Sequence, residues 1–189
     1  MRPGLRDSCC AVDAPWKAAA VTEADFDPER ILGALAAAEV RYVLIGGMAA
    51  ILHGDAGVTI DLDVAPAFDP DNLERLAAAL RSLGARVRAE GSPEGVPFDC
   101  SGAFLRNLGR DAVLNLTTQA GDIDVVFTPT GTQGFRDLKR DAISIDAGGI
   151  TILVASLADI IRSKAAADRE KDRLAVPRLR ALLERTVVR

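Results

Sequence analysis

The sequence predicts an α+β protein in which helices pack on a mixed β-sheet and a helical segment completes the C-terminus. Short apolar runs, typical of buried strands, alternate with segments whose apolar residues recur at helical spacing. Two pairs of strand candidates are separated by short links that contain glycine, which predicts hairpins. The 189 residues are 49% hydrophobic and 26% charged, and a chain of this length buries a core without disulfides or a structural metal.

The first half of the chain is predicted to alternate helices and strands after a disordered tail over residues 1–24. Asp27 and Asp69 each precede a proline, and this arrangement caps a helix and starts its first turn. The expected elements are a helix from Pro28, a strand at 41–45, a short helix Met48–His53, a strand Thr59–Val64, a helix from Pro70 to Leu83, a strand Ala85–Ala89 and a loop over 91–101.

The second half is predicted to hold two hairpins and then helices. Ser156 is expected to cap a helix, because Asp159 follows three residues later. The expected elements are strands Val113–Thr117 and Ile123–Phe127, a short helix near Phe135–Lys139, strands Ala142–Ile145 and Ile150–Val154, a helix to about Ala167, and a last helical stretch to about Thr186 with Pro177 in or near its first turn. We assign residues 25–155 to a core and 156–189 to a C-terminal helical segment packed on it.

The charge and cysteine content exclude several classes of protein. The formal net charge of −4 excludes a wholly basic nucleic-acid coat protein but not a local basic groove. Cys9, Cys10 and Cys100 offer neither a disulfide framework nor a zinc-ligand spacing, which predicts reduced thiols and a cytoplasmic location. The single histidine, His53, excludes a two-histidine metal motif. We expect no membrane partner, because no apolar run approaches the roughly 20 residues that span a bilayer and no signal-peptide pattern opens the chain.

Asp61 and Asp63 form the most informative pair of acidic residues. On a strand, residues two apart point to the same face, so the two carboxylates project together while Ile60, Leu62 and Val64 face the core. Two adjacent carboxylates repel each other, and a divalent cation relieves that repulsion. A ligand set of oxygens alone favours Mg²⁺ or Mn²⁺. Alternating aspartates also occur on solvated strand faces, and that alternative stays open for the pair taken alone.

Gly46 and Gly47 stand where a predicted strand turns into a short helix. Without Cβ atoms, their backbone N–H groups can approach a phosphate closely, and the helix dipole favours negative charge there. Two adjacent glycines more often form only a turn. His53 ends the same helix, either as a packing or capping histidine or as a substrate contact.

The two motifs together are more specific than either alone. A Gly-Gly turn followed by Asp-x-Asp, here with 13 residues between Gly47 and Asp61, resembles the nucleotidyltransferase superfamily with its DNA polymerase β-like fold. The resemblance implies a nucleotidyltransferase core, an NTP substrate, and a third metal-binding carboxylate from a nearby strand. Asp124 is the candidate, because an acid inside a strand needs a partner and a shared metal is one. Asp122 reads as a turn residue at the hairpin.

A second segment narrows the resemblance. The run Ile-Leu-Val-Ala-Ser-Leu-Ala-Asp-Ile-Ile-Arg-Ser-Lys at 152–164 precedes Arg-Glu-Lys-Asp at 169–172. It resembles the AbiEii-like nucleotidyltransferases, including the MenT-type toxins, over roughly residues 27–186. The resemblance implies that Lys164 contacts the nucleotide phosphates and that Asp172 supports catalysis.

Alternatives remain for these residues. Lys164 has the alternative of a solvated helix residue, although a lysine on a helix rich in Ile, Leu and Ala favours a function, and Asp172 could equally cap the last helix. The sequence also departs from the family, which often has an arginine two residues before the Thr or Ser of the Asp-x-Asp strand. Gly57 stands there, so a phosphate contact from such an arginine is missing or replaced.

The resemblance implies a toxin that blocks translation by adding nucleotides to the 3′ end of tRNA, with a cognate antitoxin as partner. Residues 169–189 carry seven Arg or Lys against three acids, which indicates a groove for a polyanion or simply a solvated helix face. Rival hypotheses are nucleotide transfer to a small molecule or a protein, and a catalytically idle binding module. Thr59 shares the face of Asp61, so a phosphate on Thr59 is predicted to repel the NTP and silence the enzyme.

Overall fold

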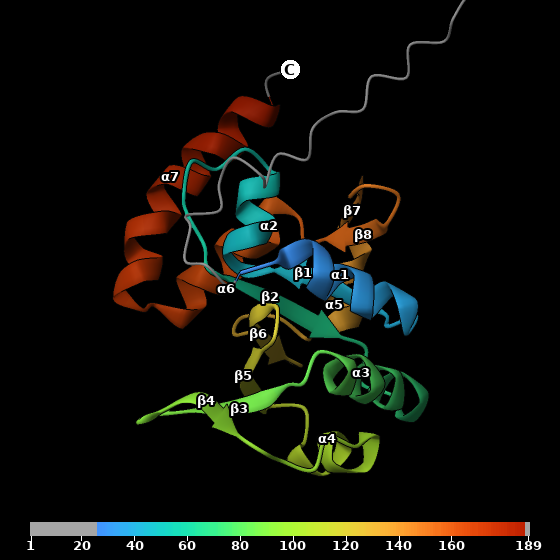
Figure 1. Ribbon diagram of the computed structural model, residues 1–189. Coiled ribbons are helices and arrows are strands. Elements are labelled where there is room, and N and C mark those ends of the chain that lie inside the picture. The colour runs from blue at the N-terminus through green and yellow to red at the C-terminus, as the bar shows by residue number, and fades with distance from the viewer. Residues whose placement is uncertain (1–25, 188–189) are drawn as a thin grey trace, which may run out of the picture.

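The structure, a computed structural model, describes residues 26–187, so the tail predicted over 1–24 lies outside the described residues. One mixed eight-stranded sheet, in the order β4-β3-β5-β6-β2-β1-β8-β7, runs through the described chain (Figure 1). In chain order the elements are α1 (Pro28–Ala37), β1 (Tyr42–Ile45), α2 (Gly46–Leu52), β2 (Asp61–Pro66), α3 (Pro70–Ser82), β3 (Arg86–Ala89), β4 (Ser92–Val96), α4 (Gly102–Leu108), β5 (Val113–Thr118), β6 (Gly121–Val126), α5 (Phe135–Arg140), β7 (Ile143–Asp146), β8 (Thr151–Val154), α6 (Leu157–Ala167) and α7 (Glu170–Val187). This confirms the predicted α+β class.

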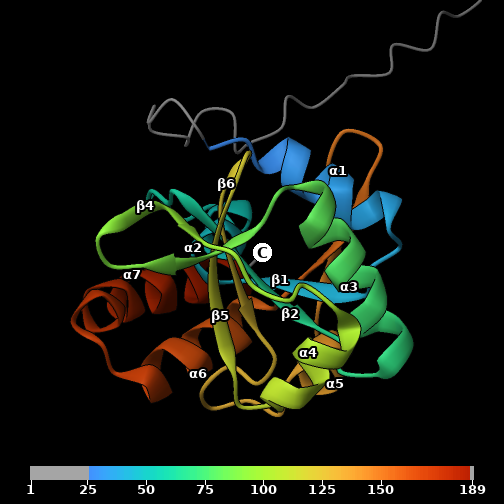
Figure 2. The same cartoon turned by 60° about the horizontal axis from the view of Figure 1, so that its bottom comes forward.

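Helices cover both sides of the sheet. Figures 1 and 2 show α3 and α4 on one side and α6 and α7 on the other. The central strands supply a core of fully buried side chains, among them Leu44, Leu62 and Ile123. Truncating one of these to alanine is expected to cost about 2–5 kcal/mol. Within residues 26–187, no helix is both long and apolar enough to cross a membrane.

Three predicted helix caps are confirmed. Asp27 accepts a hydrogen bond from the backbone N–H of Arg30, and Asp69 accepts one from Asn72. Ser156 likewise accepts from the backbone of Asp159, at 3.1 Å. Each cap satisfies a donor that would otherwise lack a partner in the first turn of its helix.

Strand β2 lies at the centre of the sheet, antiparallel to β1 and parallel to β6. Leu62 and Val64 are fully buried, so the predicted alternation with Asp61 and Asp63 is confirmed. The predicted start at Thr59 is wrong, because pairing begins only at Asp61. Ile60, predicted to face the core, consequently lies outside the strand and is 51% exposed.

Two elements appear where the sequence predicted a loop or nothing. The predicted loop 91–101 contains β4, an edge strand that pairs with β3. Its proline and glycine are typical of loops, but an edge strand tolerates a proline because one of its sides forms no backbone hydrogen bonds with a neighbouring strand. The helix α4 lies in a stretch for which no element was predicted, and Ser101 caps it by accepting from Phe104 N at 3.1 Å.

The last helix is longer than predicted. It begins at Glu170, so Pro177 lies inside α7 rather than in its first turn. A proline in a helix interior removes one backbone hydrogen bond and costs about 3 kcal/mol. The buried side chains of Ala175 and Leu179, on either side of the proline, hold both flanking turns against the protein.

Candidate active site

The Gly-Gly turn packs directly on the Asp-x-Asp strand. Gly46 begins α2 with φ at +70°, and a Cβ built on it would overlap the carboxyl group of Asp63. A Cβ on Gly47 would lie 2.7 Å from Thr59 Oγ1. Both glycines are therefore required for the close approach of α2 to the acidic strand, because the side chains of Asp63 and Thr59 occupy the space that a Cβ would need.

The two aspartates of the strand have different surroundings. The Thr59 hydroxyl donates a hydrogen bond to Asp61 Oδ1 at 2.6 Å, and Thr59 itself is buried. In the part of the chain that the structure describes, no group donates a hydrogen bond to the Asp63 carboxylate. Burial, followed by repulsion from Asp61 and Asp124, raises the pKa of Asp63 to about 7 although Lys164 counteracts it.

Asp124 lies opposite Asp63 in the register of β2 and β6, but it has partners of its own. Arg88 of β3 forms an ion pair with Asp124 and a second one, at 2.7 Å, with Asp122. Asn115 of β5, with its amide nitrogen turned toward Asp124, lies 3.1 Å from Oδ2. Burial raises the pKa of Asp124, and Arg88 counteracts that shift. The partner expected for this acid was a metal ion, whereas the structure supplies an arginine.

Arg88 and Asp122 are residues of this site that sequence reasoning missed. Asp122 belongs to β6 rather than to the hairpin turn, and it pairs in register with Asp61. Arg88 lies 36 residues before Asp124, with β5 between their strands. No local sequence pattern predicts the contact of Arg88 with these acids. The spacing of two residues between Asp122 and Asp124 indicates only that these two side chains share one face of the strand.

The acidic residues fit a divalent cation as a pair, not as a preformed triad. Within residues 26–187, no three His, Cys, Asp or Glu side chains are arranged to hold a metal ion. Asp63 nevertheless is a half-buried carboxylate that accepts no hydrogen bond from the described residues, and Asp61 is its neighbour on the same face. Mg²⁺ commonly takes one or two carboxylates and completes its shell with water and substrate phosphates. The donor set of Asp61 and Asp63 therefore suits this ion.

Lys164 and Asp172 form a partly buried ion pair. Lys164 Nζ donates to Asp172 Oδ1 at 3.2 Å, and Arg169 Nε donates to Oδ2 at 2.6 Å. Asp168, in the left-handed conformation, ends α6 and lets α7 turn back toward it. Asp172 is fully buried, and although burial disfavours its charge, the two donors hold its pKa below the ordinary value. It therefore anchors Lys164 instead of capping α7.

A cavity of about 340 Å³ brings several predicted residues together. Gly46, Asp63, Asp124 and Lys164 line it, from four different elements of the fold. Asp61, Gly47, Thr59 and Asp172 do not line it. Asp61 and Gly47 are next to lining residues in the sequence or on the strand, Thr59 contacts both of them, and Asp172 binds the lining residue Lys164. The cavity therefore joins the glycine turn, the acidic strands and the lysine.

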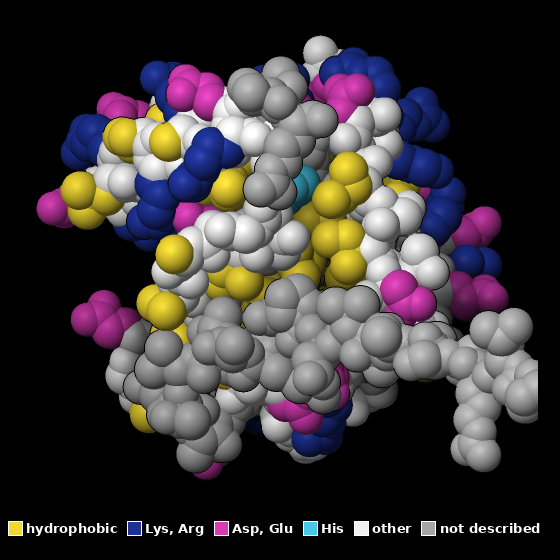
Figure 3. All heavy atoms as spheres, turned by 90° about the horizontal axis from the view of Figure 1, so that it is seen from above, with side chains coloured by type: hydrophobic (Ala, Val, Ile, Leu, Met, Phe, Trp, Pro, Cys, Tyr) yellow, Lys and Arg dark blue, Asp and Glu magenta, His cyan; other side chains and the backbone are white. Residues whose placement is uncertain are grey.

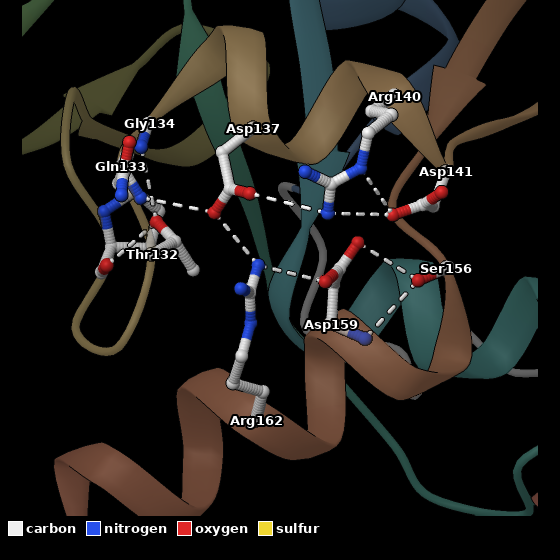
Figure 4. A network of polar contacts seen from close by, with 10 residues as sticks. Thr132, Gln133, Gly134, Asp137, Arg140, Asp141, Ser156, Asp159 and Arg162 are labelled. Atoms are coloured by element: carbon white, nitrogen blue, oxygen red, sulfur yellow. Dashed lines mark hydrogen bonds and ion pairs between the residues drawn. The ribbon is translucent and has the colours of Figure 1, made fainter.

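A polar network fixes the helix that carries Lys164 (Figure 4). Arg162 of α6 lies 2.8 Å from Asp137 of α5 and 2.8 Å from Asp159 in its own helix. Asp159 also accepts from Ser156, and Asp137 accepts from the backbone of Gln133 at 3.0 Å. Both carboxylates are largely buried, so the network ties the first turns of α6 to α5.

The basic residues of the C-terminal segment are partly neutralised. Arg178 of α7 binds both carboxylate oxygens of Asp55, at 2.5 and 2.9 Å. Its guanidinium lies beside Gly57, where an added Cβ would come within 2.9 Å of it, so the close packing of α7 on this segment requires a glycine. Figure 3 shows Lys and Arg side chains interspersed with Asp and Glu on the face that is seen from above Figure 1. His53 Nε2 donates to the carbonyl of Ala155 at 2.8 Å, in agreement with the packing alternative.

One known protein family matches most of this chain. Residues 30–178 match the family described as nucleotidyl transferase AbiEii toxin, type IV toxin–antitoxin system. A lincomycin-bound lincosamide antibiotic adenylyltransferase, LnuA, has a TM-score of 0.54 at 15% identity, over 84% of this chain and 99% of that chain. A putative nucleotidyltransferase from Thermotoga maritima and the antibiotic-resistance factor ANT(2'')-Ia both have TM-scores of 0.49 at 14% identity, over 84% of this chain and 91% and 82% of theirs. No curated protein matches.

Proposed function

The chain belongs to the AbiEii family of nucleotidyltransferase toxins of type IV toxin–antitoxin systems, and from this we propose that it transfers a nucleoside monophosphate from an NTP to the 3′ end of tRNA. It is a nucleotidyltransferase, and its family implies an antitoxin partner. The observation that carries the proposal is the cavity where Asp63, Gly46 and Lys164 meet. We also infer that the enzyme works in the cytoplasm, where tRNA is found.

The proposed reaction is an in-line displacement at the α-phosphorus of the NTP. A hydroxyl oxygen of the acceptor forms a bond to phosphorus and loses its proton, while the bond to the bridging oxygen breaks and pyrophosphate leaves. Mg²⁺ or Mn²⁺, held by Asp61 and Asp63, would supply a Lewis acid for the phosphate and the attacking oxygen. Gly46 and Gly47, which pack against Asp63 and Thr59 at the start of α2, are proposed to offer backbone N–H groups to the triphosphate.

Lys164 is proposed to neutralise the charge that develops on the phosphates. Its ammonium group has three N–H donors, of which Asp172 accepts one at 3.2 Å. The buried Asp172 thereby fixes the position of Nζ and leaves other donors for the substrate. In this proposal Lys164 touches the nucleotide and Asp172 is a positioning residue.

The proposed acceptor site is a cleft of about 550 Å³ that adjoins the cavity at Asp124. Arg88, Arg169 and Lys171 line this cleft together with Glu90, Asp122 and Asp124. Arg88 and Arg169 are ion-paired with aspartates, so Lys171 is the cation proposed to meet the phosphates of a polyanionic acceptor. Aromatic residues are 4% of the chain, which favours recognition through phosphates over base stacking. These features support an RNA acceptor better than a small cationic one.

The test uses labelled NTPs, one at a time, with Mg²⁺ and total tRNA. Label is expected in tRNA, whereas tRNA oxidised with periodate, which lacks an intact 3′-terminal ribose, is expected to remain unlabelled. Lys164→Ala should reduce the transfer at least tenfold. Label that accumulates equally in intact and oxidised tRNA, or only in protein or a small molecule, would contradict the proposed acceptor.

A further inference from the structure

Arg88 reaches the acidic strands from a distance of two strands. It lies on β3, and its guanidinium passes β5 to reach both Asp122 and Asp124 of β6. The pairing of β3 with β4 shifts register between Val87 and Ala89, and such irregularities redirect the side chain between them. This irregularity in the backbone at Arg88 favours an orientation in which the side chain points toward the two carboxylates.

The contact is shielded from solvent more than an ordinary surface ion pair. The side chain of Asp124 is 17% exposed and that of Arg88 is 34% exposed. A planar guanidinium presents two forks of N–H donors, and here one terminal nitrogen serves each carboxylate. With Asn115 also turned toward it, Asp124 has its hydrogen-bonding needs met by the protein.

Asp63, directly opposite, has no such donor among the described residues. The carboxylates of the site therefore fall into two groups. Arg88 neutralises Asp122 and Asp124, whereas Asp61 and Asp63 have no cationic side chain as a partner among the described residues. We propose that Arg88 is an internal counter-cation that competes with the divalent cation for Asp124, so that the resting enzyme offers only Asp61 and Asp63 to the metal. This inference rests on the metal site of the proposed function.

The test measures the affinity for Mn²⁺ alone, without nucleotide, by isothermal titration calorimetry and by the loss of the free Mn²⁺ paramagnetic resonance signal. Four proteins are compared: wild type, Arg88→Gln, Asp124→Asn and the double variant. Because a third carboxylate becomes available, Arg88→Gln should bind Mn²⁺ about tenfold more tightly, since ligand charge and number set such affinities. Asp124→Asn should change the affinity of the wild type about twofold or less, and should remove the gain in the double variant.

Arg86→Gln is the matched control for charge. Arg86 lies on the same strand, and its guanidinium donates to the carbonyl of Gly95 at 3.1 Å instead of to a carboxylate. The same loss of one positive charge should therefore leave the Mn²⁺ affinity near that of the wild type. If Arg88→Gln fails to fold, Arg88→Lys keeps the charge but loses the forked contact, and a gain in affinity that depends on Asp124 is expected for it too.

The outcomes separate this inference from the proposed function. Unchanged Mn²⁺ affinity in Arg88→Gln, or a gain that persists in the double variant with Asp124→Asn, would overturn the role of Arg88 alone. Mn²⁺ binding that Asp61→Asn leaves intact would contradict the metal site itself, and this inference would fall with it.

Discussion

Asp63 of β2 and Asp124 of β6 face each other in a parallel register, yet within residues 26–187 only Asp124 has a cationic partner at hydrogen-bonding distance. The free-energy cost of keeping the carboxylate ionised is therefore higher for Asp63 than for Asp124. A buried carboxylate without a donor destabilises the fold unless a ligand compensates it. This asymmetry is what we expect of a site that binds a divalent cation together with the triphosphate of an NTP.

Asp63→Asn is expected to stabilise the protein in the absence of metal and nucleotide. The substitution removes a half-buried charge that no described donor compensates, and a gain of about 1–2 kcal/mol in the free energy of unfolding is typical of such changes at functional sites. Thermal unfolding at pH 8 measures it, with Asp111→Asn at an exposed loop position as control. Mg²⁺ should raise the melting temperature of the wild type and not that of Asp63→Asn. A lower melting temperature for Asp63→Asn would contradict this interpretation.

Asp172 predicts a specific dependence of stability on pH. The hydrogen bonds from Arg169 and Lys164 outweigh burial and hold its pKa below the ordinary value of 3.8. The stabilising contribution is therefore complete above about pH 5, well above the ordinary pKa, and is lost as the pH falls through the lower pKa of the folded state. Asp172→Asn should cost about 3 kcal/mol at pH 7, because it leaves a partly buried lysine without its partner.

Urea unfolding of Asp172→Asn and wild type at several pH values checks this prediction. The difference between the two proteins should narrow below pH 4. Asp168→Asn, whose side chain is 68% exposed, should have little effect at any pH. A difference that stays constant down to pH 2 would show that Asp172 stabilises the fold by packing and not by its charge.

Asp137 is expected to act on catalysis from a distance. Asp137→Ala leaves Arg162 and the Gln133 N–H without their shared partner and should cost about 2 kcal/mol of stability. Because the network fixes α6, nucleotide transfer should also decline through misplacement of Lys164. Asp141→Ala, at a position that is 50% exposed, is the control. Full activity of Asp137→Ala would show that the polar network does not position Lys164 for nucleotide transfer.

Thr59 is predicted to be a point of regulation. Its hydroxyl donates to Asp61 at 2.6 Å, so a phosphate on that oxygen would add about −1.5 to −2 charges beside the acidic strand and abolish NTP binding. Because Thr59 is only 9% exposed, the segment before β2 has to open for modification. Thr59→Val should keep most activity and escape this control.

Co-expression with a cognate antitoxin, followed by intact-mass measurement and peptide mapping, tests the prediction for Thr59. The modified protein should carry one phosphate, placed on that residue. Inhibition of the protein without any phosphate on Thr59 would rule the mechanism out.

Local patterns predicted the acidic strand and the glycine turn because their signals lie within a few residues. The period of two places Asp61 and Asp63 on one face, and the lack of Cβ atoms at Gly46 and Gly47 permits close packing. Nothing local predicts that Gly46 touches Asp63, because that contact depends on how β1 pairs with β2.

The partners of the other acids could not be predicted for the same reason. Arg88 meets Asp124 only through the order of three strands, and Lys164 meets Asp172 only because Asp168 reverses the chain. The edge strand β4 was missed since its pairing with β3, not its own composition, creates it. Long-range pairing therefore accounts for most of what the sequence left open.

The central claim, a cation-dependent nucleotidyl transfer at the acidic strand, is tested most directly by Asp61→Asn. Its transfer of labelled nucleotide to tRNA in the presence of Mg²⁺ is compared with that of the wild type, and the fold is verified by thermal unfolding. We predict that Asp61→Asn folds normally and loses at least a thousandfold in transfer rate, a loss of about 4 kcal/mol in transition-state stabilisation, and that EDTA abolishes the wild-type activity. Transfer at the wild-type rate by Asp61→Asn, or wild-type activity that persists in EDTA, would contradict the account.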